Sequence, residues 1–367
     1  VALALAQEYA EYRGLNFSPV EEYIALACVG TVGDVVPLLD ENRIIVKYGL
    51  KKINENPGCG LQALMEVVGF NNKDIQSEQI GYIIAPRLNA AGRVEDPRNA
   101  FELLVTDNYQ DALHHAQFLN ECNIKRQKEE NKVFENIFED KKNQDFMNDE
   151  IVVLSGKNWN TGVLGIIASR LSERLLRPVI VLSEDNINAV GSARSIVGFN
   201  ITEALEKVSS LLIRYGGHEM AAGLKISLSN LELFRQQMNE LFGDYVRMMK
   251  EKIGIVVDAQ LTMADVDPQL MSWLKKLQPF GEKNPNPLFV SSDVIVNERW
   301  FSGKNRQRLE LVLMQNNKMR QHRIDATISS ENVSDLASSS LIDLIFEVRR
   351  GYWDQPYLKI MDWRIKK

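Results

Sequence analysis

Apolar side chains recur at helical spacing through the first 110 residues of the chain. The run Tyr23–Ala27 fits one face of a helix, which we expect to break at the glycine-bearing stretch 30–33. A second amphipathic pattern, Asn42–Ile53, predicts another helix. No strand-like alternation is visible here, so the sequence predicts a layer of helices joined by short loops.

The stretch PRLNAAGR, Pro86–Arg93, interrupts this helical pattern. It combines a proline, a glycine and several polar side chains, which is typical of a loop. Such a loop would place Arg87, Asn89 and Arg93 close together. We therefore predict a polar, arginine-bearing surface at this point of the helical layer.

One long helix is predicted from residue 107 to about residue 148. Its early part carries Leu113, Ala116 and Leu119 at helical spacing, and its late part carries Val133 and Ile137. The segment between them, NECNIKRQKEENK, is polar on nearly every face. A helix that is polar all round usually crosses solvent between two domains, so we predict a connector helix.

Residues 150–250 show the pattern of a compact α/β unit. Two short apolar runs, Ile151–Leu154 and Arg177–Leu182, flank the amphipathic stretch Val163–Leu175. Buried strands joined by a helix indicate a parallel βαβ crossover. A further helical pattern, from about Ser229 to Lys250, completes the unit.

Two glycine-bearing motifs lie inside this unit, GSARS at Gly191–Ser195 and YGGHEMAAG at Tyr215–Gly223, with one helical pattern between them. Glycine lets backbone N–H groups approach an anion closely, and Ser192, Arg194 and His218 add side-chain donors. Each motif could instead be a tight turn, with His218 a core histidine. Because both motifs occur in one unit, we predict two glycine-rich loops that together bind phosphate.

From residue 251 onward the pattern changes to short strands. A connector rich in Pro, Gly and Asn leads into a series of strand-like runs. Together with a helix-like insertion at residues 331–339, five short strands suggest a small closed barrel of the OB-fold type. The predicted strands are Val294–Phe301, Leu309–Met314, Arg323–Ile328, Leu341–Arg350 and Tyr357–Arg364.

Basic and aromatic residues crowd together in this predicted barrel. The mixture suits a surface that stacks nucleic-acid bases while following a phosphate backbone. Ordinary surface charge beside a few core aromatics is the alternative explanation. The residues concerned are Arg299, Trp300, Phe301, Lys304, Arg306, Arg308, Arg349, Arg350, Tyr352 and Trp353.

Composition limits the function classes. The 367 residues, 45% hydrophobic and 25% charged, are typical of a soluble globular protein with two or three domains. A formal net charge of −6 gives no global basic field, although nucleic-acid binding needs only a local basic groove. Three widely spaced cysteines argue for a reducing cytoplasm and against a zinc site. No apolar run reaches membrane-spanning length.

Six motifs occur in one order along the chain. Together they resemble the RecJ family, single-strand-specific 5′ exonucleases of the DHH phosphoesterase superfamily, over nearly the whole chain. No single motif is specific, but six in the same order leave little room for chance agreement. They are GTVGDVVPLLDENR (Gly30–Arg43), APRLNAAGR (Ala85–Arg93), LNECNIKRQ (Leu119–Gln127), GSARS, YGGHEMAAG and LQPFGEKNP.

The resemblance implies an α/β plus β architecture in four parts. These are the C-terminal part of a DHH catalytic domain (1–106), a long connector helix (107–149), an α/β DHH-associated substrate-binding domain (150–250) and a C-terminal OB-fold-like barrel that binds single-stranded DNA (251–367). It further implies a 5′–3′ exonuclease of DNA repair and recombination. The first residues enter at helical spacing without a Met, so we expect them to belong to a longer protein.

The resemblance also implies a two-metal site for Mn²⁺ or Mg²⁺. In the family, the ligands come from Asp-x-Asp, a further Asp, Asp-His-His and the Asp of a GTxxD loop. Only the last maps onto this sequence, as Asp34; ADVD at Ala264–Asp267 stands at the barrel entrance and is discounted. Because a metal pair needs several oxygen or imidazole ligands, we expect this chain to be inactive alone. Asp-x-Asp and Asp-His-His motifs encoded upstream would support the nuclease hypothesis.

The other implied residues concern substrate binding. The family's GSxRS motif meets the 5′-terminal phosphate, which here implies Ser192 and Arg194. The Gly-Gly-His motif implies that His218 lies against backbone phosphate near the metals, so His218 joins Asp34 as a catalytic candidate. The full set expected to contact nucleic acid is Arg87, Asn89, Arg93, Ser192, Arg194, Ser195, Gly216, Gly217 and His218.

Five positions depart from the family pattern. Asn160 stands where histidine is usual, and Gly33 stands where alanine is common. Asn158, Ala193 and Lys283 stand where glycine is common. Most of these changes are small, but Asn160 leaves the substrate contacts of its loop open.

Two alternatives remain beside the exonuclease hypothesis. A non-catalytic, single-stranded-DNA-binding DHH-family protein would keep the binding surface without the chemistry, but Asp34 weighs against it. An oligonucleotide phosphodiesterase of the same superfamily would not need the OB-like barrel. The exonuclease hypothesis predicts as partners single-stranded DNA with a 5′-phosphate, a single-stranded-DNA-binding protein and a helicase. It also predicts a cytoplasmic monomer without membrane association.

Overall fold

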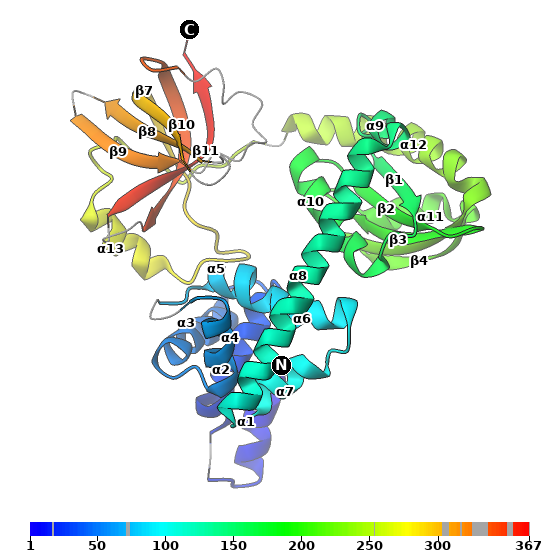
Figure 1. Ribbon diagram of the computed structural model, residues 1–367. Coiled ribbons are helices and arrows are strands. Elements are labelled where there is room, and N and C mark those ends of the chain that lie inside the picture. Colours follow the sequence, from blue (N-terminus) through cyan, green and yellow to red (C-terminus); the bar gives the residue numbers. More distant parts are fainter. Residues whose placement is uncertain are drawn as a thin grey trace. The chain divides into compact units, whose positions relative to one another are not determined.

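The computed structural model divides into two compact units. The first consists of Val1–Asn56, Asp74–Gly81 and Ile255–Lys367, and the second of Pro57–Lys73 and Tyr82–Gly254. Figure 1 shows the helices and strands of each. The residues that the structure describes are 1–16, 18–70, 74–252, 254–302, 308–315, 318–324, 337–350 and 355–366.

The N-terminal part of the first unit is helical, as predicted, with α1 (Ala2–Tyr12), α2 (Pro19–Gly33), α3 (Asp40–Glu55) and the short α5 (Ser77–Gln79). The predicted break at residues 30–33 is wrong, because α2 continues to Gly33 and ends at Asp34. Within this helix the Thr31 hydroxyl donates to the carbonyl of Ala27, one turn earlier, so it does not compete with the helix for other partners. Val35, the next residue, has φ 54°, a left-handed conformation that the helix cannot continue through.

The helices of the second unit begin with α4 (Cys59–Val67). A π-helical turn, η1 (Ile80–Ile84), leads into α6 (Ala85–Val94), followed by α7 (Arg98–Val105). The loop predicted for PRLNAAGR is therefore wrong. Pro86 lies in the first turn of α6, where a missing N–H costs nothing, and alanine, leucine and arginine favour the rest of the helix.

The long predicted helix is present as α8 (Tyr109–Glu139), but it ends earlier than predicted. Asp140 accepts a hydrogen bond from the N–H of Lys142 and so begins a separate short helix, α9 (Lys141–Phe146). Several polar residues in the middle of α8 do not face solvent, because Asn123, Arg126 and Glu130 are buried. That part of the connector prediction is wrong.

The α/β part of the second unit begins with the predicted crossover. Strand β1 (Val152–Lys157) and strand β2 (Val179–Glu184) pair in parallel and are joined by α10 (Thr161–Leu175). In the described part of the chain, the sheet has five strands in the order β1-β2-β3-β5-β4. The remaining elements are β3 (Asn188–Arg194), α11 (Ile201–Lys207), η2 (Ser209–Leu211), β4 (Leu212–His218), β5 (Ala221–Ser227), η3 (Leu228–Asn230) and α12 (Leu231–Lys252).

The two glycine motifs lie in strands, so the prediction of glycine-rich loops is wrong. Gly191–Arg194 of GSARS form the end of β3, and YGGH forms the end of β4. The reason is alternation along β3, where Ala189 and Ala193 enter the core while Ser192 and Arg194 point to the other face. Backbone pairing across this sheet outweighed the local preference of glycine for turns.

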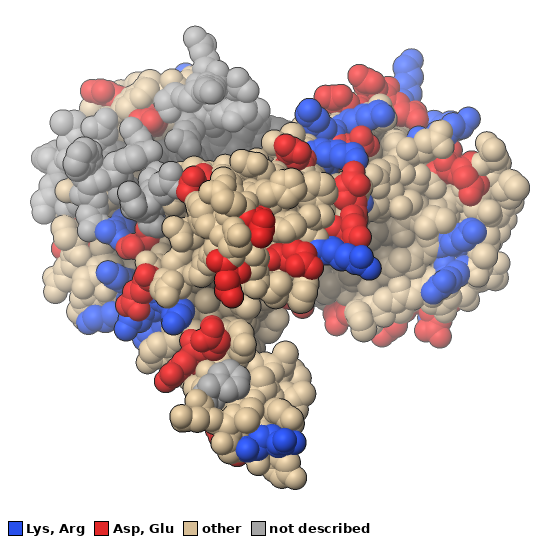
Figure 2. Space-filling model, turned by 60° about the horizontal axis from the view of Figure 1, so that its bottom comes forward, with Lys and Arg blue, Asp and Glu red and all other residues tan. Residues whose placement is uncertain are grey.

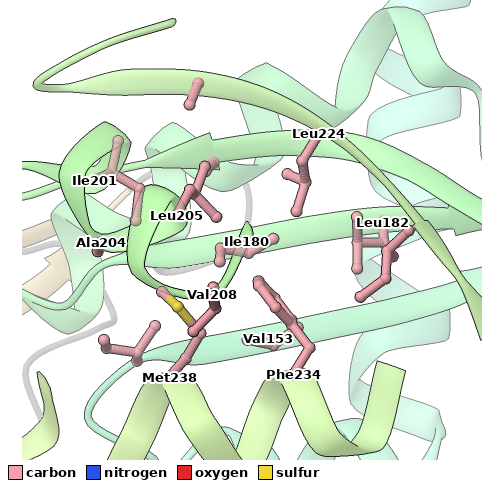
Figure 3. Packing of buried hydrophobic residues seen from close by; sticks show 14 of the residues in the cluster. Val153, Ile180, Leu182, Ile201, Ala204, Leu205, Val208, Leu224, Phe234 and Met238 are labelled. Carbon is pink, nitrogen blue, oxygen red and sulfur yellow. The ribbon is translucent and has the colours of Figure 1, made fainter. Parts of the chain in front are cut away.

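Helices pack against both faces of the sheet at strands β1 and β2. Val152, Leu154, Val179 and Val181 contact the cluster under α8 and α10. The opposite face carries Val153, Ile180, Leu182 and Leu224, which Figure 3 shows against side chains of α11 and α12. Each fully buried side chain of this size contributes about 1.5–3 kcal/mol, so this core fixes the plane of the sheet.

The first unit ends in a curled sheet, in line with the predicted barrel. Described strands follow the order β11-β10-β7-β8-β9, with β6 paired to β7, and β9 also lies near β11. The α/β plus β fold class is confirmed. The elements are β6 (Ala259–Gln260), α13 (Pro268–Leu277), β7 (Phe289–Ser302), β8 (Arg308–Gln315), β9 (Lys318–Ile324), β10 (Leu341–Arg350) and β11 (Pro356–Ile365).

One predicted strand of the barrel, Arg323–Ile328, is shifted. Strand β9 begins at Lys318, which pairs with Gln315 of β8. Residues 325–328 and residues 331–336 of the predicted insertion lie outside the described residues. The two acids of ADVD have local roles, since Asp265 accepts hydrogen bonds from Thr262 and Asp267 caps α13.

Two departures from the family pattern share one backbone conformation. Asn158 has φ 57° and Lys283 has φ 58°, both in the left-handed region that favours glycine. Asparagine tolerates this conformation better than lysine does. Lys283 lies in a tight turn closed by Gly281 and Asn284, which bond to each other in both directions.

Lys283→Gly is expected to stabilise the first unit by about 0.5–1 kcal/mol. A left-handed lysine costs about 1–2 kcal/mol, and the greater chain entropy of glycine in the unfolded state cancels part of the gain. The measurement is the denaturant midpoint of the first unit, with Glu282→Gly as the control at a neighbouring position of ordinary φ. An equal or lower midpoint for Lys283→Gly would contradict the strain argument.

Candidate nucleic-acid interface

The β3–β5–β4 side of the sheet has one face that α11 and α12 do not cover. In the strand register, Ser192 lies beside Gly223, and Gly223 lies beside Gly216. We call such a set of residues, paired across β3, β5 and β4, a row; the row two residues further along β3 contains Arg194, Ala221 and His218. Directly paired residues share a face of an antiparallel sheet, and so do residues two apart. Ser192, Arg194 and His218 therefore share one surface.

Two of the glycines on this surface have no packing reason within the protein. A Cβ at Gly216 would meet no atom within 4 Å, and one at Gly223 would meet only the Gly191 carbonyl oxygen at 3.9 Å. Gly217 and Gly191 differ, because a Cβ there would lie 2.3 Å and 1.9 Å from backbone oxygens. Gly216 and Gly223 thus leave a bare backbone surface beside Ser192 that only a group from outside would use.

Arg194 is held in place by neutral oxygen atoms. Its Nε donates to Ser169 Oγ at 3.1 Å, and its Nη1 donates to Ser192 Oγ and to the Ala193 carbonyl, both at 2.9 Å. Helix α10 makes room for it, because a Cβ at Gly165 would lie 3.0 Å from Nη2. The contacts orient the guanidinium without neutralising its charge.

Arg93 joins this surface from α6. Its Nη1 donates to the Gly162 carbonyl at 3.0 Å, in the first turn of α10. A Cβ at Gly162 would lie 2.6 Å from the Arg93 carbonyl oxygen, so α6 and α10 meet backbone to backbone here. Asn160 caps α10 by accepting from the N–H of Gly162. The residue that replaces the family's histidine therefore has a structural role in this chain.

Arg87 faces a different neighbour, helix α8. Its Nε donates to Asn120 Oδ1 at 2.9 Å, and its Nη1 donates to the Ile83 carbonyl at 2.7 Å. Asn89 is exposed two positions further on, which on a helix is a different face. The structure therefore separates these residues, and the predicted cluster of Arg87, Asn89 and Arg93 on one loop is wrong.

Three arginines of this region have no carboxylate partner. In the described ranges, no Asp or Glu oxygen lies within 4 Å of the guanidinium of Arg87, Arg93 or Arg194. Burial lowers the pKa of Arg194, and the positive charge of Arg93 lowers it further. Burial and the charge of Arg126 lower the pKa of Arg87 in the same way. An anion bound here would relieve this mutual repulsion.

A buried ionic network between α8 and α10 is a feature that the sequence pattern did not predict. Glu130, fully buried on α8, bonds to Arg126 one turn away and lies 3.1 Å from Arg170 of α10. Arg126 also donates to Asn123 at 2.9 Å. The signal was present as an unbroken 3–4 residue spacing from Leu119 through these polar positions to Ile137.

Two other predicted residues have defined places. Ser195 is buried, and its hydroxyl donates to the Phe199 carbonyl, so the hydroxyl proton is engaged in a hydrogen bond within the protein. His218 is exposed, and its carbonyl accepts from Thr202 at 2.8 Å. The imidazole of His218 thus lies at the edge of the surface while its backbone is fixed.

Asp34 belongs to the first unit and is described within that unit. It is exposed at the end of α2, and none of the described side chains donates a hydrogen bond to its carboxylate. Among the described residues there is no group of three or more His, Cys, Asp and Glu side chains that could hold a metal ion. The described part of the chain therefore does not fit a metal pair.

The basic and aromatic residues of the barrel are only partly described. Arg349 is engaged in ion pairs with Glu347 and with Glu78 of α5, both at 2.7 Å, so its charge is balanced. Phe301 is exposed at 47%. Lys304, Arg306, Tyr352 and Trp353 lie outside the described residues, as does the side chain of Arg308.

The face of the molecule seen in Figure 2 carries charges of both signs. Figure 2 shows Lys and Arg interspersed with Asp and Glu on the visible face. The uncompensated arginines of the second unit are therefore a local feature. Separately, no helix in the described part of the chain is both long and apolar enough to span a bilayer.

Comparisons with known proteins agree with this arrangement. Residues 148–244 match the DHHA1 domain model, and residues 257–359 match the RecJ OB domain model. The chain is 31% identical over 348 residues to the single-stranded-DNA-specific exonuclease RecJ of Bacillus subtilis, covering 93% of this chain and 44% of that protein. It is 33% identical over 282 residues to the protein of the same name from Thermus thermophilus, covering 77% of this chain and 40% of the relative.

A solved structure is similar along the whole chain. The crystal structure of the Thermus thermophilus RecJ in complex with Mn²⁺ has a TM-score of 0.81 at 28% sequence identity. The similarity covers 100% of this chain and 53% of that one. The present chain thus spans about half the length of the curated relatives it matches.

Proposed function

We propose, from the premise that this chain belongs to the RecJ family, that it forms the DNA-binding part of a single-stranded-DNA-specific 5′–3′ exonuclease. Ser192 and Arg194 bind the 5′-terminal phosphate. Gly216, Gly217 and His218 lie against the adjoining backbone. The observation that carries this proposal is two neighbouring arginines, Arg93 and Arg194, that have no carboxylate partner among the described residues and lie at a sheet surface left bare at Gly216 and Gly223.

The geometry suits a terminal phosphate better than a base. Arg194 presents a planar donor group whose orientation is already fixed, and Ser192 stands beside it. A charge-assisted hydrogen bond contributes about 1.5–3 kcal/mol, roughly twice a neutral one. Because the contacts that hold Arg194 are neutral, the incoming phosphate supplies the missing negative charge.

Chemistry on the bound strand is part of the proposal, with Mn²⁺ or Mg²⁺ as the catalytic ions. RecJ structures are known with Mn²⁺ and with Mg²⁺. In this chain Asp34 is the candidate ligand, and His218 is a further candidate catalytic residue. One carboxylate does not hold two ions, so the described residues alone do not form that site.

The test is binding of 3′-labelled, 5′-phosphorylated oligonucleotides of increasing length at several salt concentrations. A single-strand-binding surface predicts that affinity rises with strand length and falls steeply with salt, because neutralised phosphates release counterions. Double-stranded DNA of the same sequence serves as the control and is expected to bind more weakly. Affinity that does not depend on strand length would refute the proposal in favour of a phosphodiesterase for very short substrates.

A non-catalytic single-stranded-DNA-binding protein is the second candidate. It is favoured by the single metal-ligand candidate among the described residues. Turnover distinguishes the two functions. We expect this chain alone to show no manganese-dependent exonuclease activity, and the same chain joined to a segment carrying Asp-x-Asp and Asp-His-His to gain it. Continued inactivity of the longer protein would support the non-catalytic function.

A further inference from the structure

A second pair of basic residues lies on the same sheet surface as Ser192 and Arg194. Arg214 of β4 and Lys225 of β5 are direct partners in the strand register, one row beyond the pair Gly216 and Gly223. Arg214 is exposed, and the neighbours of Lys225 along β5 are core residues. Both basic side chains therefore point to the uncovered face.

This pairing is unfavourable within the protein alone. Like charges directly opposite each other on antiparallel strands destabilise a sheet. Within the described residues, no carboxylate lies within 4 Å of either side chain. The carboxylate of Asp185 accepts the N–H groups of Ile187 and Asn188, which lower its pKa, and the charge of Lys225 lowers that pKa further. An anion between the two strands would reverse the repulsion.

The rows follow one direction across the sheet. Arg194 and His218 lie in the first row, Ser192 with Gly223 and Gly216 in the second, and Arg214 and Lys225 in the third, beside Val190 of β3. Two residues of antiparallel strand span about 6.8 Å, so the third row begins about that far from Ser192. Long, flexible basic side chains in the third row can reach back over the bare glycine backbone.

From this arrangement we propose that Arg214 and Lys225 form a second anion subsite, which binds the outer phosphates of a 5′-triphosphorylated strand end. The proposal rests on the proposed function, since it takes the first phosphate to be bound by Ser192 and Arg194. The bare surface at Gly216 and Gly223 accommodates the linking phosphate.

A polyphosphate fits this surface better than a further nucleotide does. Bases bound by proteins usually stack on aromatic rings. Among the described residues, the third row and the glycine row carry no aromatic side chain on this face, because Tyr215 packs against the core on the other side. The surface offers charge and bare backbone, which recognise phosphate, and no platform for a base.

The experiment compares one 3′-fluorescein oligonucleotide with a 5′-hydroxyl, a 5′-monophosphate or a 5′-triphosphate end. Binding is measured by fluorescence anisotropy at about 0.15 M salt without divalent ions, where exposed charges are already partly screened. The chain is used unchanged, as Arg214→Ala/Lys225→Ala, and as Lys207→Ala. Lys207 is exposed on α11, which packs on the opposite face, so Lys207→Ala controls for the loss of a positive charge away from this surface.

We expect the unchanged chain to bind the triphosphate end at least about tenfold more tightly than the monophosphate end. The double variant is expected to lose this preference while keeping its preference for monophosphate over hydroxyl, which also shows that it is folded. Lys207→Ala is expected to keep both preferences. Inorganic tripolyphosphate is expected to displace the triphosphorylated strand at concentrations at which inorganic phosphate does not.

Each contrary result has a separate meaning. Equal affinity for triphosphate and monophosphate ends, both above hydroxyl, would overturn the second subsite and leave the proposed function intact. Equal affinity for monophosphate and hydroxyl ends would instead overturn the proposed function. A triphosphate preference that survives in the double variant would show that Arg214 and Lys225 are not the residues responsible.

Discussion

Glu130→Ala is expected to lower the free energy of unfolding of the second unit by about 3–5 kcal/mol. Glu130 is fully buried, and its carboxylate is the acidic partner of both Arg126 and Arg170. Removing it leaves the guanidinium of Arg126, 7% exposed, without its counter-charge. Hydrogen exchange of α8 and α10 amides at increasing denaturant measures the change.

Two further variants separate charge from packing in this prediction. Glu130→Gln keeps the side-chain volume and removes the charge, so most of the loss is expected to remain. Glu135→Ala removes an exposed glutamate of the same helix and is expected to change stability by less than about 0.5 kcal/mol. Equal effects of Glu130→Ala and Glu135→Ala would contradict the buried network.

Arg194→Gln is expected to weaken binding of a 5′-phosphorylated oligonucleotide by about 10- to 100-fold. Binding of the 5′-hydroxyl oligonucleotide is expected to change little, because that end lacks the charge that Arg194 recognises. Arg194→Lys is expected to give an intermediate loss, since a lysine keeps the charge but not the planar donor group. Anisotropy titrations of both ends measure the difference.

Arg174→Gln is the matched control for the Arg194 variants. Arg174 is exposed in the last turn of α10, the helix against which Arg194 packs. Arg174→Gln removes one positive charge from the second unit, as Arg194→Gln does, so a purely long-range effect of net charge would appear in both variants. Equal losses for phosphorylated and hydroxyl ends in Arg194→Gln would exclude a specific contact with the terminal phosphate.

The sequence predicted the structure best where the spacing of apolar residues matches their burial in the fold. The apolar runs Ile151–Leu154 and Arg177–Leu182 around an amphipathic helix predicted the parallel crossover, which the structure confirms. The six ordered motifs predicted the RecJ resemblance, which the domain matches confirm. In both cases the signal extends over many residues, so local exceptions do not cancel it.

The sequence misled where a local preference conflicted with the sheet. The glycines of GSARS and YGGH suggested loops, yet these motifs end β3 and β4. The alternation of Ala189 and Ala193 with Ser192 and Arg194 was the better signal, because it states which side chains enter the core. For function the correction changes the shape of the site from two enclosing loops to an open surface.

The buried charges of α8 could not be recognised from hydrophobicity alone. Asn123, Arg126 and Glu130 look like a solvated face until their burial, their contacts with one another and the contact of Glu130 with Arg170 of α10 are known. Similarly, Pro86 and Gly92 suggest a loop at PRLNAAGR, but the helix-favouring residues between them form helix α6. Pairing across elements is a property of the fold, and a single sequence shows it only indirectly.

The most direct test of the proposed phosphate-binding surface is an NMR titration with 5′-phosphorylated and 5′-hydroxyl oligonucleotides, following the backbone amides of Gly216, Gly217 and Gly223. Binding as proposed predicts that the phosphorylated strand shifts these amides and that the hydroxyl strand leaves them nearly unchanged. Shifts that are the same for both strands, or that appear only on the face covered by α11 and α12, would contradict it.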